Sequence, residues 1–106
     1  MHFYCTCGTC IHDITDNIPH KAYLLSDEDE DRYCEAIEAV MRDESLTMDE
    51  RVNRIVISLQ TRYLSRSIYQ CPDCGKLFVD DNNYKLHSFV PEEPVDKHLL
   101  TAARED

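Results

Sequence analysis

The sequence predicts an α+β fold in which the two ends of the chain come together around an inserted helical hairpin. Three observations predict this arrangement. Cysteines gather near both ends of the chain, two amphipathic segments with helix-capping residues occupy its middle, and two short apolar runs joined by a polar turn follow the second cysteine group. We expect a single domain over residues 1–106, because a chain of this length has one modest hydrophobic core.

The second cysteine group defines half of a metal site. Residues 71–76 read CPDCGK, so two residues separate the thiols of Cys71 and Cys74 and a glycine follows. A glycine at this place relieves the positive φ that a tight thiolate turn often demands. Structural zinc is almost always four-coordinate, so two further ligands must come from elsewhere in the chain.

The N-terminal cysteines supply that second half. Cys5 and Cys7 follow an aromatic residue and precede Gly8, as Cys71 and Cys74 follow Tyr69 and precede a glycine. An alternative pair, Cys7 and Cys10, has the usual two-residue spacing but no glycine after it. The predicted site is one structural zinc ion bound by Cys5, Cys7, Cys71 and Cys74, with Cys10 as the alternate ligand.

The use of the cysteines depends on the compartment. The N-terminus has no basic region followed by an apolar stretch, and no run approaches the roughly 18 apolar residues of a membrane span, so we expect a cytoplasmic protein. Six cysteines in a cytosolic chain favour metal ligands over disulfides.

A first helix is predicted to begin after Ser26, an N-cap with Asp29 three residues further on. The acidic run 27–31 lies in its first turn, where the helix dipole stabilises carboxylates. Apolar residues then recur at helical spacing: Tyr33, Ile37, Val40 and Met41. Cys34, which has no partner thiol at ligand spacing, is predicted to be a small buried hydrophobe.

A second helix is predicted from Thr47, whose capping box includes Glu50, to about Leu64. Its apolar positions recur at intervals of three and four: Val52, Ile55, Val56, Leu59 and Tyr63. The acidic first helix and the arginine-bearing second helix, joined by a short loop, predict an antiparallel hairpin over 26–66 with complementary charges.

The segment after the second cysteine pair predicts a β-hairpin. Two apolar runs, 77–79 and 84–90, flank the Asp/Asn turn 80–83. Residues 92–106 form a tail with a weak helical pattern at 95–104, while 13–26 is expected to connect the first cysteines to the hairpin, with the apolar stretch 22–25 docking on the core.

These end segments, 1–12 and 68–91, resemble a zinc ribbon. The resemblance is carried by the knuckle at 71–76, the β-hairpin after it, and the pair Cys5 and Cys7 with Gly8. It implies a bound metal and a local fold without implying one function. Four thiolates would close the zinc shell, and the sequence contains neither an H-E-x-x-H motif nor a zinc-deaminase motif, so we do not expect an enzyme.

The net charge of the chain indicates what kind of partner it binds. With 21 acidic and 11 basic residues the formal net charge is −10, which disfavours phosphate backbones and favours a basic protein. The profile is similar to that of small acidic immunity proteins that neutralise basic, nuclease-type toxins. The expected contact residues are acidic: Asp27, Glu28, Asp29, Glu30, Asp31, Glu35 and Glu38.

The sequence is also compatible with two other functions. A nucleic-acid or transcription-associated zinc ribbon would need its basic residues gathered on one exposed face. A thiol redox or metal-handling protein would cycle Cys71 and Cys74 through a disulfide.

Overall fold

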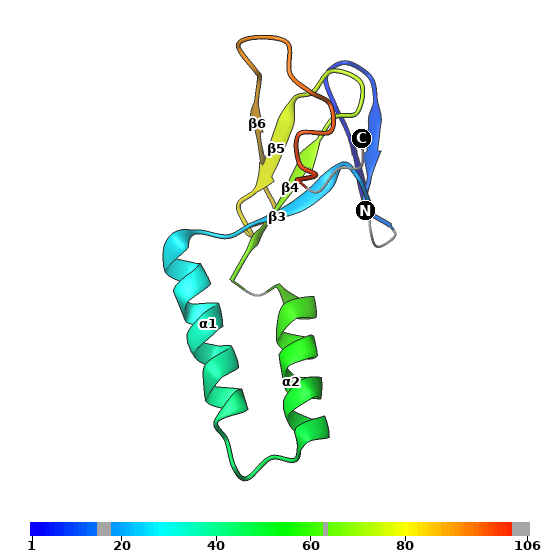
Figure 1. Cartoon of the computed structure of the whole chain (residues 1–106). Helices are drawn as coiled ribbons and strands as arrows, with labels where there is room; N and C mark the ends of the chain where they lie inside the picture. The colour runs from blue at the N-terminus through cyan, green and yellow to red at the C-terminus, as the bar shows by residue number, and fades with distance from the viewer. Residues whose placement is uncertain (15–17, 63, 103–106) are drawn as a thin grey trace. The chain divides into compact units, whose positions relative to one another are not determined.

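The structure is a computed structural model that describes residues 1–14, 18–62 and 64–102. Its fold is α+β, as predicted, with two helices and two β-sheets (Figure 1). The chain forms two compact units. The first, called here the β unit, comprises Met1–Tyr23 and Arg66–Asp106, and the second, the helical hairpin, comprises Leu24–Ser65.

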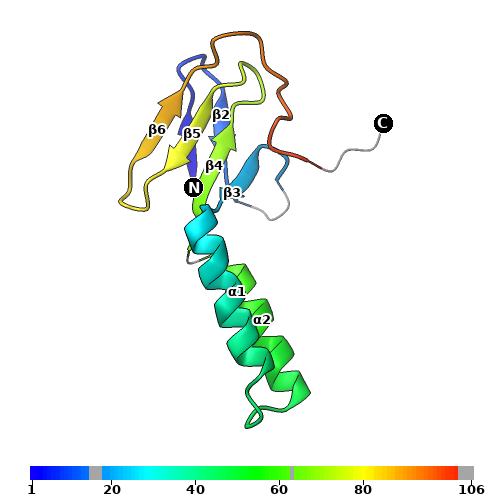
Figure 2. The ribbon, with the colours of Figure 1, turned by 60° about the vertical axis from the view of Figure 1, so that its left-hand side comes forward.

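The β unit contains both sheets. The smaller sheet is an antiparallel pair, β1 (His2–Tyr4) and β2 (Cys10–His12). The larger has the order β3-β4-β5-β6 and consists of β3 (Lys21–Leu24), β4 (Arg66–Gln70), β5 (Leu77–Asp80) and β6 (Leu86–Phe89) (Figure 2). The segment 13–26, expected to be a connection, therefore contributes a strand. Its apolar residues Tyr23, Leu24 and Leu25 are exposed rather than docked on the core.

The core of the β unit is small and contains two thiols. Cys5, Ile11, Tyr69, Cys71 and Phe78 are buried together. Phe3 packs edge-on against two of them, with ring centroids 5.4 Å from Tyr69 and 5.1 Å from Phe78. Because Phe3 and Ile11 are directly paired across β1 and β2, this hairpin turns one face toward the core and the other toward solvent.

The predicted β-hairpin after the knuckle is present, but its turn is displaced. β5 and β6 pair antiparallel with Asp80 opposite Leu86, so the turn comprises residues 81–85 rather than 80–83. The carboxylate of Asp81 accepts backbone N–H groups from Asn83 and Lys85 at 2.7 and 3.3 Å. This side-chain capping, together with positive φ at Asn82 and Tyr84, replaces the shorter turn that the spacing predicted.

The C-terminal segment is not helical in its described part, so the helix expected at 95–104 is wrong for residues 95–102. Two turns occur there instead. The side chain of Gln70, fully buried, donates to the carbonyl of Asp96 at 2.8 Å and accepts the N–H of Leu99 at 3.0 Å. A helix of about ten residues is marginal in water, and these tertiary bonds fix another conformation.

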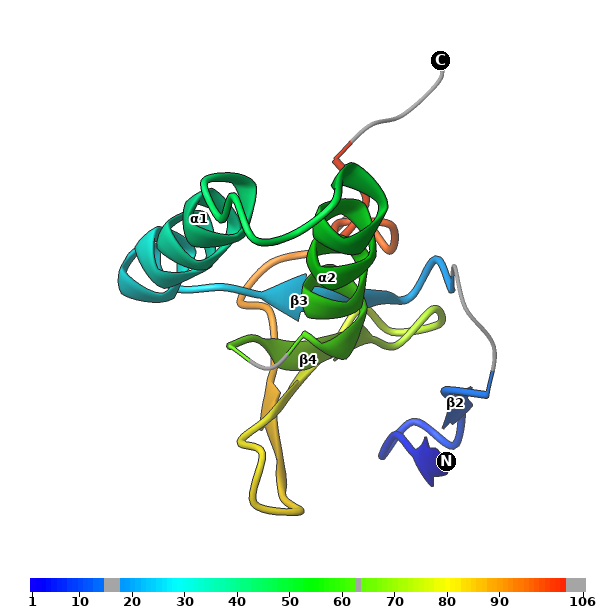
Figure 3. The same cartoon turned by 90° about the horizontal axis from the view of Figure 1, so that it is seen from below.

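The helical hairpin consists of α1 (Asp27–Met41) and α2 (Met48–Thr61), which Figure 3 shows lying side by side. Both predicted N-caps are present: Ser26 accepts the N–H of Asp29, and Thr47 forms a complete capping box with Glu50. α2 ends at Thr61 and not near Leu64, because Arg62 adopts a left-handed conformation with φ 53°. Of the apolar positions predicted for this helix, Tyr63 lies outside the described residues.

The hairpin has little buried surface. Tyr33 is its one buried side chain among the described residues, and the Tyr33 hydroxyl accepts the N–H of Leu64 at 3.3 Å. Cys34 is exposed, so the prediction that it is a buried hydrophobe is wrong. It follows Tyr33 directly on α1, and the 100° rotation per residue turns it away from the packed face.

The predicted pairing of charges between the helices takes a different form. Two ion pairs of the hairpin join residues of α1 and its C-cap, Asp29 with Arg32 and Glu38 with Arg42. Arg51 of α2 instead donates from Nε and Nη2 to the carbonyl of Asp43, at 3.1 and 2.8 Å. That contact fixes the loop between the helices.

Candidate metal centre

The four predicted ligands converge within the β unit. All sulfur atoms of Cys5, Cys7, Cys71 and Cys74 lie within 4.8 Å of one another. Cys5 Sγ is 3.5 Å from Cys74 Sγ, and Cys7 Sγ is 3.6 Å from Cys71 Sγ. A disulfide requires about 2.05 Å, whereas a tetrahedral zinc ion with Zn–S bonds of about 2.3 Å separates its sulfurs by roughly 3.8 Å. The sulfur spacing therefore fits a bound metal ion.

Two similar turns present the thiols in pairs. In the second turn, Gly75 donates its N–H to the carbonyl of Cys71 at 2.9 Å. In the first, Gly8 donates to the carbonyl of Cys5, also at 2.9 Å. Both glycines have positive φ, 98° at Gly8 and 83° at Gly75, as the sequence comparison of the two segments suggested. The first turn is one residue shorter, which accounts for its C-x-C spacing.

Only one of the two glycines is also required by its surroundings. A Cβ atom on Gly75 would lie 2.6 Å from Val95 Cγ1, whereas nothing lies within 4 Å of the corresponding position on Gly8. The C-terminal segment therefore packs directly on the second turn. This close approach could not be read from the local CPDCGK pattern.

Side chains also join the two turns to each other. Thr9, after the first pair, donates a hydrogen bond to the carboxylate of Asp73, inside the second pair. Lys76, after the second pair, donates to the hydroxyl of Thr6, inside the first. These two bonds join the turns independently of any ion that the thiols bind.

The four thiols differ in exposure and in pKa. Cys5 and Cys71 are buried, while Cys7 and Cys74 are exposed. Hydrogen bonds with the side chain and backbone of Thr9 lower the pKa of Cys7 to about 6. A backbone hydrogen bond at Lys76 lowers the pKa of Cys74, but burial and the neighbouring thiols outweigh it and raise the pKa to about 11. Since metals bind thiolates, uptake of an ion would release protons from this cluster.

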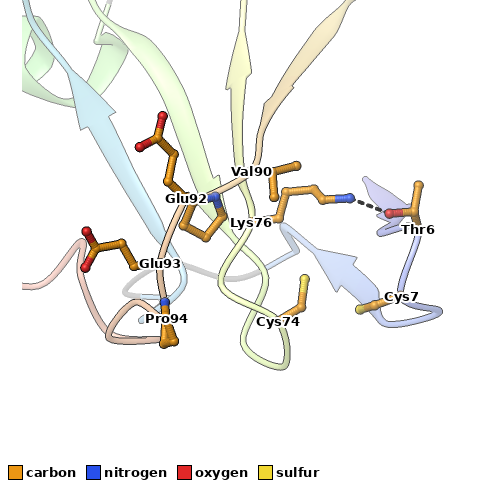
Figure 4. Close-up of a pocket in the computed structure, with 9 residues that line it drawn as sticks. Thr6, Cys7, Cys74, Lys76, Val90, Glu92, Glu93 and Pro94 are labelled. Atoms are coloured by element: carbon orange, nitrogen blue, oxygen red, sulfur yellow. Dashed lines mark hydrogen bonds between the residues drawn. The ribbon is translucent and has the colours of Figure 1, made fainter.

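The exposed half of the cluster borders an open groove of about 480 Å³ (Figure 4). Cys7 and Cys74 lie along it, and the bond from Lys76 to Thr6 crosses it. Its other wall is the connector after β6: Val90, Pro91, Glu92, Glu93 and Pro94.

Cys10, the alternate ligand, lies outside the cluster of four. It is an exposed residue of β2, directly opposite Tyr4 in the strand pairing. The hydrogen bond from Cys5 N–H to the carbonyl of Thr9 closes the first turn just before Cys10. Cys10 therefore lies on the outer face of the β1–β2 hairpin, while Cys5 and Cys7 lie at the candidate metal site.

A partly buried carboxylate, Asp13, supports the core next to the site, and no pattern in the sequence indicated this contact. Asp13 accepts hydrogen bonds from Tyr69 and from Lys21, both at 2.7 Å. Burial opposes ionisation of Asp13, but these two bonds outweigh it and lower its pKa. Burial and the bond to Asp13 raise the pKa of Tyr69 to about 12. A local signal for this contact is lacking because Asp13 and Tyr69 are 56 residues apart.

The acidic residues predicted to contact a partner all lie on α1 of the helical hairpin. Most are exposed, but Asp29 is partly buried and is held by Ser26 and Arg32, while Glu38 pairs with Arg42. The carboxylates at 27, 28, 30, 31 and 35 remain on the exposed surface. Within the described part of the chain, no helix is long and apolar enough to cross a membrane.

Comparison with known proteins identifies one protein family. Residues 1–93 match the family described as Domain of unknown function (DUF8617). The chain therefore belongs to this family, and the matched region includes both thiol pairs and the whole helical hairpin. Neither a curated protein nor a solved structure gives a significant match.

Proposed function

We propose that this protein is a zinc-stabilised binding module whose helical hairpin binds a basic protein. The surface of that hairpin supports the proposal, because an exposed apolar stripe on α2 lies beside the strongly acidic helix α1. The metal in this proposal is structural, because four thiolates complete a tetrahedral shell and leave no position open for a substrate.

The apolar stripe lies on α2. None of its described side chains is buried, and four apolar residues at helical spacing are 43 to 61% exposed: Met48, Val52, Val56 and Leu59. Exposed apolar surface rimmed by charge is typical of protein-binding sites. An amphipathic helix laid along such a stripe is a common mode of recognition.

Charge favours a basic partner over a second copy of the chain. The hairpin holds eleven acidic residues and five arginines, a formal charge of −6. Two such hairpins would repel each other, whereas a basic amphipathic segment would be attracted to α1 and could bury the stripe of α2. A nuclease-type toxin is one kind of partner with this chemistry, and the small size and net charge of −10 support that narrower proposal.

The test uses a basic amphipathic helical peptide as the probe and an NMR titration of the labelled protein as the readout. We expect shifts concentrated on α1 and α2. Val52→Ser with Val56→Ser removes apolar surface without changing charge, and we expect affinity to fall by about tenfold, since two partly exposed valines contribute roughly 1–2 kcal/mol. Replacing the acids at 27–31 by Asn and Gln should slow association and flatten its salt dependence.

Val90→Ser is the matched control, because Val90 is 71% exposed in the β unit. It should bind the peptide as the wild type does. Equal binding by the Val52/Val56 variant, or dimers of the free protein that dissociate on making that change, would contradict the proposal.

A further inference from the structure

Three of the five histidines lie near one another at the end of the β1–β2 hairpin that is opposite its thiol turn. His2 of β1 and His12 of β2 are directly opposite in the strand pairing. His20, just before β3, has its ring centroid 5.5 Å from that of His12, with the planes at 89°. We propose that His2, His12 and His20 form a second site, which binds a divalent transition-metal ion such as Zn²⁺.

The strand pattern places His2 and His12 side by side. Phe3 and Ile11 face the core, so their neighbours His2 and His12 project from the opposite, exposed face of the β1–β2 hairpin. Directly opposed residues of an antiparallel pair have Cβ atoms about 5 Å apart, within reach of a shared ion. The bond from Asp13 N–H to the carbonyl of Met1, at 2.9 Å, fixes this end of the hairpin.

His20 has the hydrogen bonding of a metal ligand. Its Nε2 lies 2.8 Å from the carbonyl oxygen of His12, and a carbonyl can only accept. Nε2 must therefore carry a proton, which leaves Nδ1 of the neutral ring as a free electron pair. Histidines that bind metals usually donate their second ring nitrogen to a carbonyl or carboxylate in this way. The carbonyl of His20 also accepts the N–H of Gln70, so its backbone is fixed to β4.

The site forms when the exposed rings turn. Among the described residues only the four cysteines already have their ligand atoms within 4.8 Å of one another. His2 and His12 are exposed, and exposed side chains change rotamer within nanoseconds, so their imidazoles can converge on an ion held by His20. Cys10, two residues before His12 on the same strand face, is available as a fourth ligand.

To test this site, Zn²⁺ is titrated into protein that already holds one equivalent of zinc. We expect a second equivalent to bind at micromolar zinc and to shift the imidazole nitrogen resonances of these three histidines in NMR spectra. His12→Ala and His20→Ala should each weaken that second equivalent by tenfold or more while the first is retained. His87→Ala, which removes a histidine paired with Asp81 in the other hairpin, should leave both equivalents unchanged.

Two outcomes would overturn the site: a second equivalent that binds only at millimolar zinc, or one that His12→Ala and His20→Ala leave intact. Because the first equivalent is measured in the same titration, loss of the cysteine site is distinguished from loss of the histidine site. Cys10→Ser then identifies the ligands. A lower affinity for the second zinc ion would show that the Cys10 sulfur is a ligand, and an unchanged affinity would show that the three imidazoles bind it alone.

Discussion

The β unit and the helical hairpin are stabilised in different ways. The β unit contains almost all the buried side chains of the described chain, yet two of these are thiols of the metal site. The described residues of the hairpin bury one tyrosine, and the hairpin relies on local interactions, namely two N-caps, ion pairs of α1 and its C-cap, and the contact of Arg51 with the loop. One region depends on contacts between distant residues and the other on contacts between neighbours, so perturbations should affect them unequally.

The largest expected effect follows from loss of a buried ligand. Cys71→Ser removes one of four thiolates. Structural zinc contributes an apparent binding free energy of about 10–16 kcal/mol to the folding of zinc-finger peptides, so we expect the β unit to lose its dispersed amide spectrum. A strong chelator should do the same to the wild type. Cys34→Ser is the matched control, since Cys34 is an exposed thiol of the hairpin, and it should retain zinc and thermal stability.

A β unit that stays folded after complete removal of metal would contradict the claim that its stability depends on the metal site. It would mean that the core of Ile11, Tyr69 and Phe78, with the bonds between the two thiol turns, is sufficient without an ion.

An intermediate effect is expected at the two turn glycines. Gly75→Ala adds a side chain at a positive φ and against Val95, so we expect a loss of about 2–4 kcal/mol in the free energy of unfolding. Gly8→Ala has the same conformational penalty without the clash and should cost about 1–2 kcal/mol. Chemical denaturation of both zinc-loaded variants measures the difference, and equal losses would contradict the packing of the C-terminal segment on the second turn.

The smallest effect should be confined to the hairpin. Thr47→Ala removes the N-cap of α2 and should cost about 1 kcal/mol, seen as faster hydrogen exchange in its first turn. Thr61→Ala, at the other end of the same helix, changes an exposed hydroxyl and serves as the control. Zinc affinity should be unchanged in both. A lower affinity in Thr47→Ala would show that the two units are energetically coupled.

Features encoded by neighbouring residues could be predicted from the sequence. The ligand pairs were visible because each thiol turn contains its own cysteines and glycine, and the helices because Ser26 and Thr47 carry capping signals. Features that depend on distant partners could not. β3 pairs with β4, which lies more than forty residues later in the chain. The sequence does not indicate that Gln70 is buried, because its hydrogen-bond partners, Asp96 and Leu99, are distant in the chain.

Helical periodicity also has a limit of its own. Four of the predicted apolar positions, Val52, Ile55, Val56 and Leu59, do lie on α2, but a repeat of apolar residues indicates that a face exists without indicating what covers it. The same limit explains Cys34, since hydrophobic character predicted burial and helix rotation decided exposure. For Cys10, the deciding factor was the closure of the first turn by Cys5 and Thr9.

The strand order has a consequence for the evolution of this fold. The chain leaves the larger sheet after β3 and returns at β4, and these strands are neighbours. The two exit points are therefore about one strand spacing apart, roughly 4.8 Å. Closing a longer loop is inexpensive, about 0.6 kcal/mol for each doubling of its length. The position between these strands is thus a permissive insertion point, where related chains can differ in length and recognition while conserving the cysteine turns.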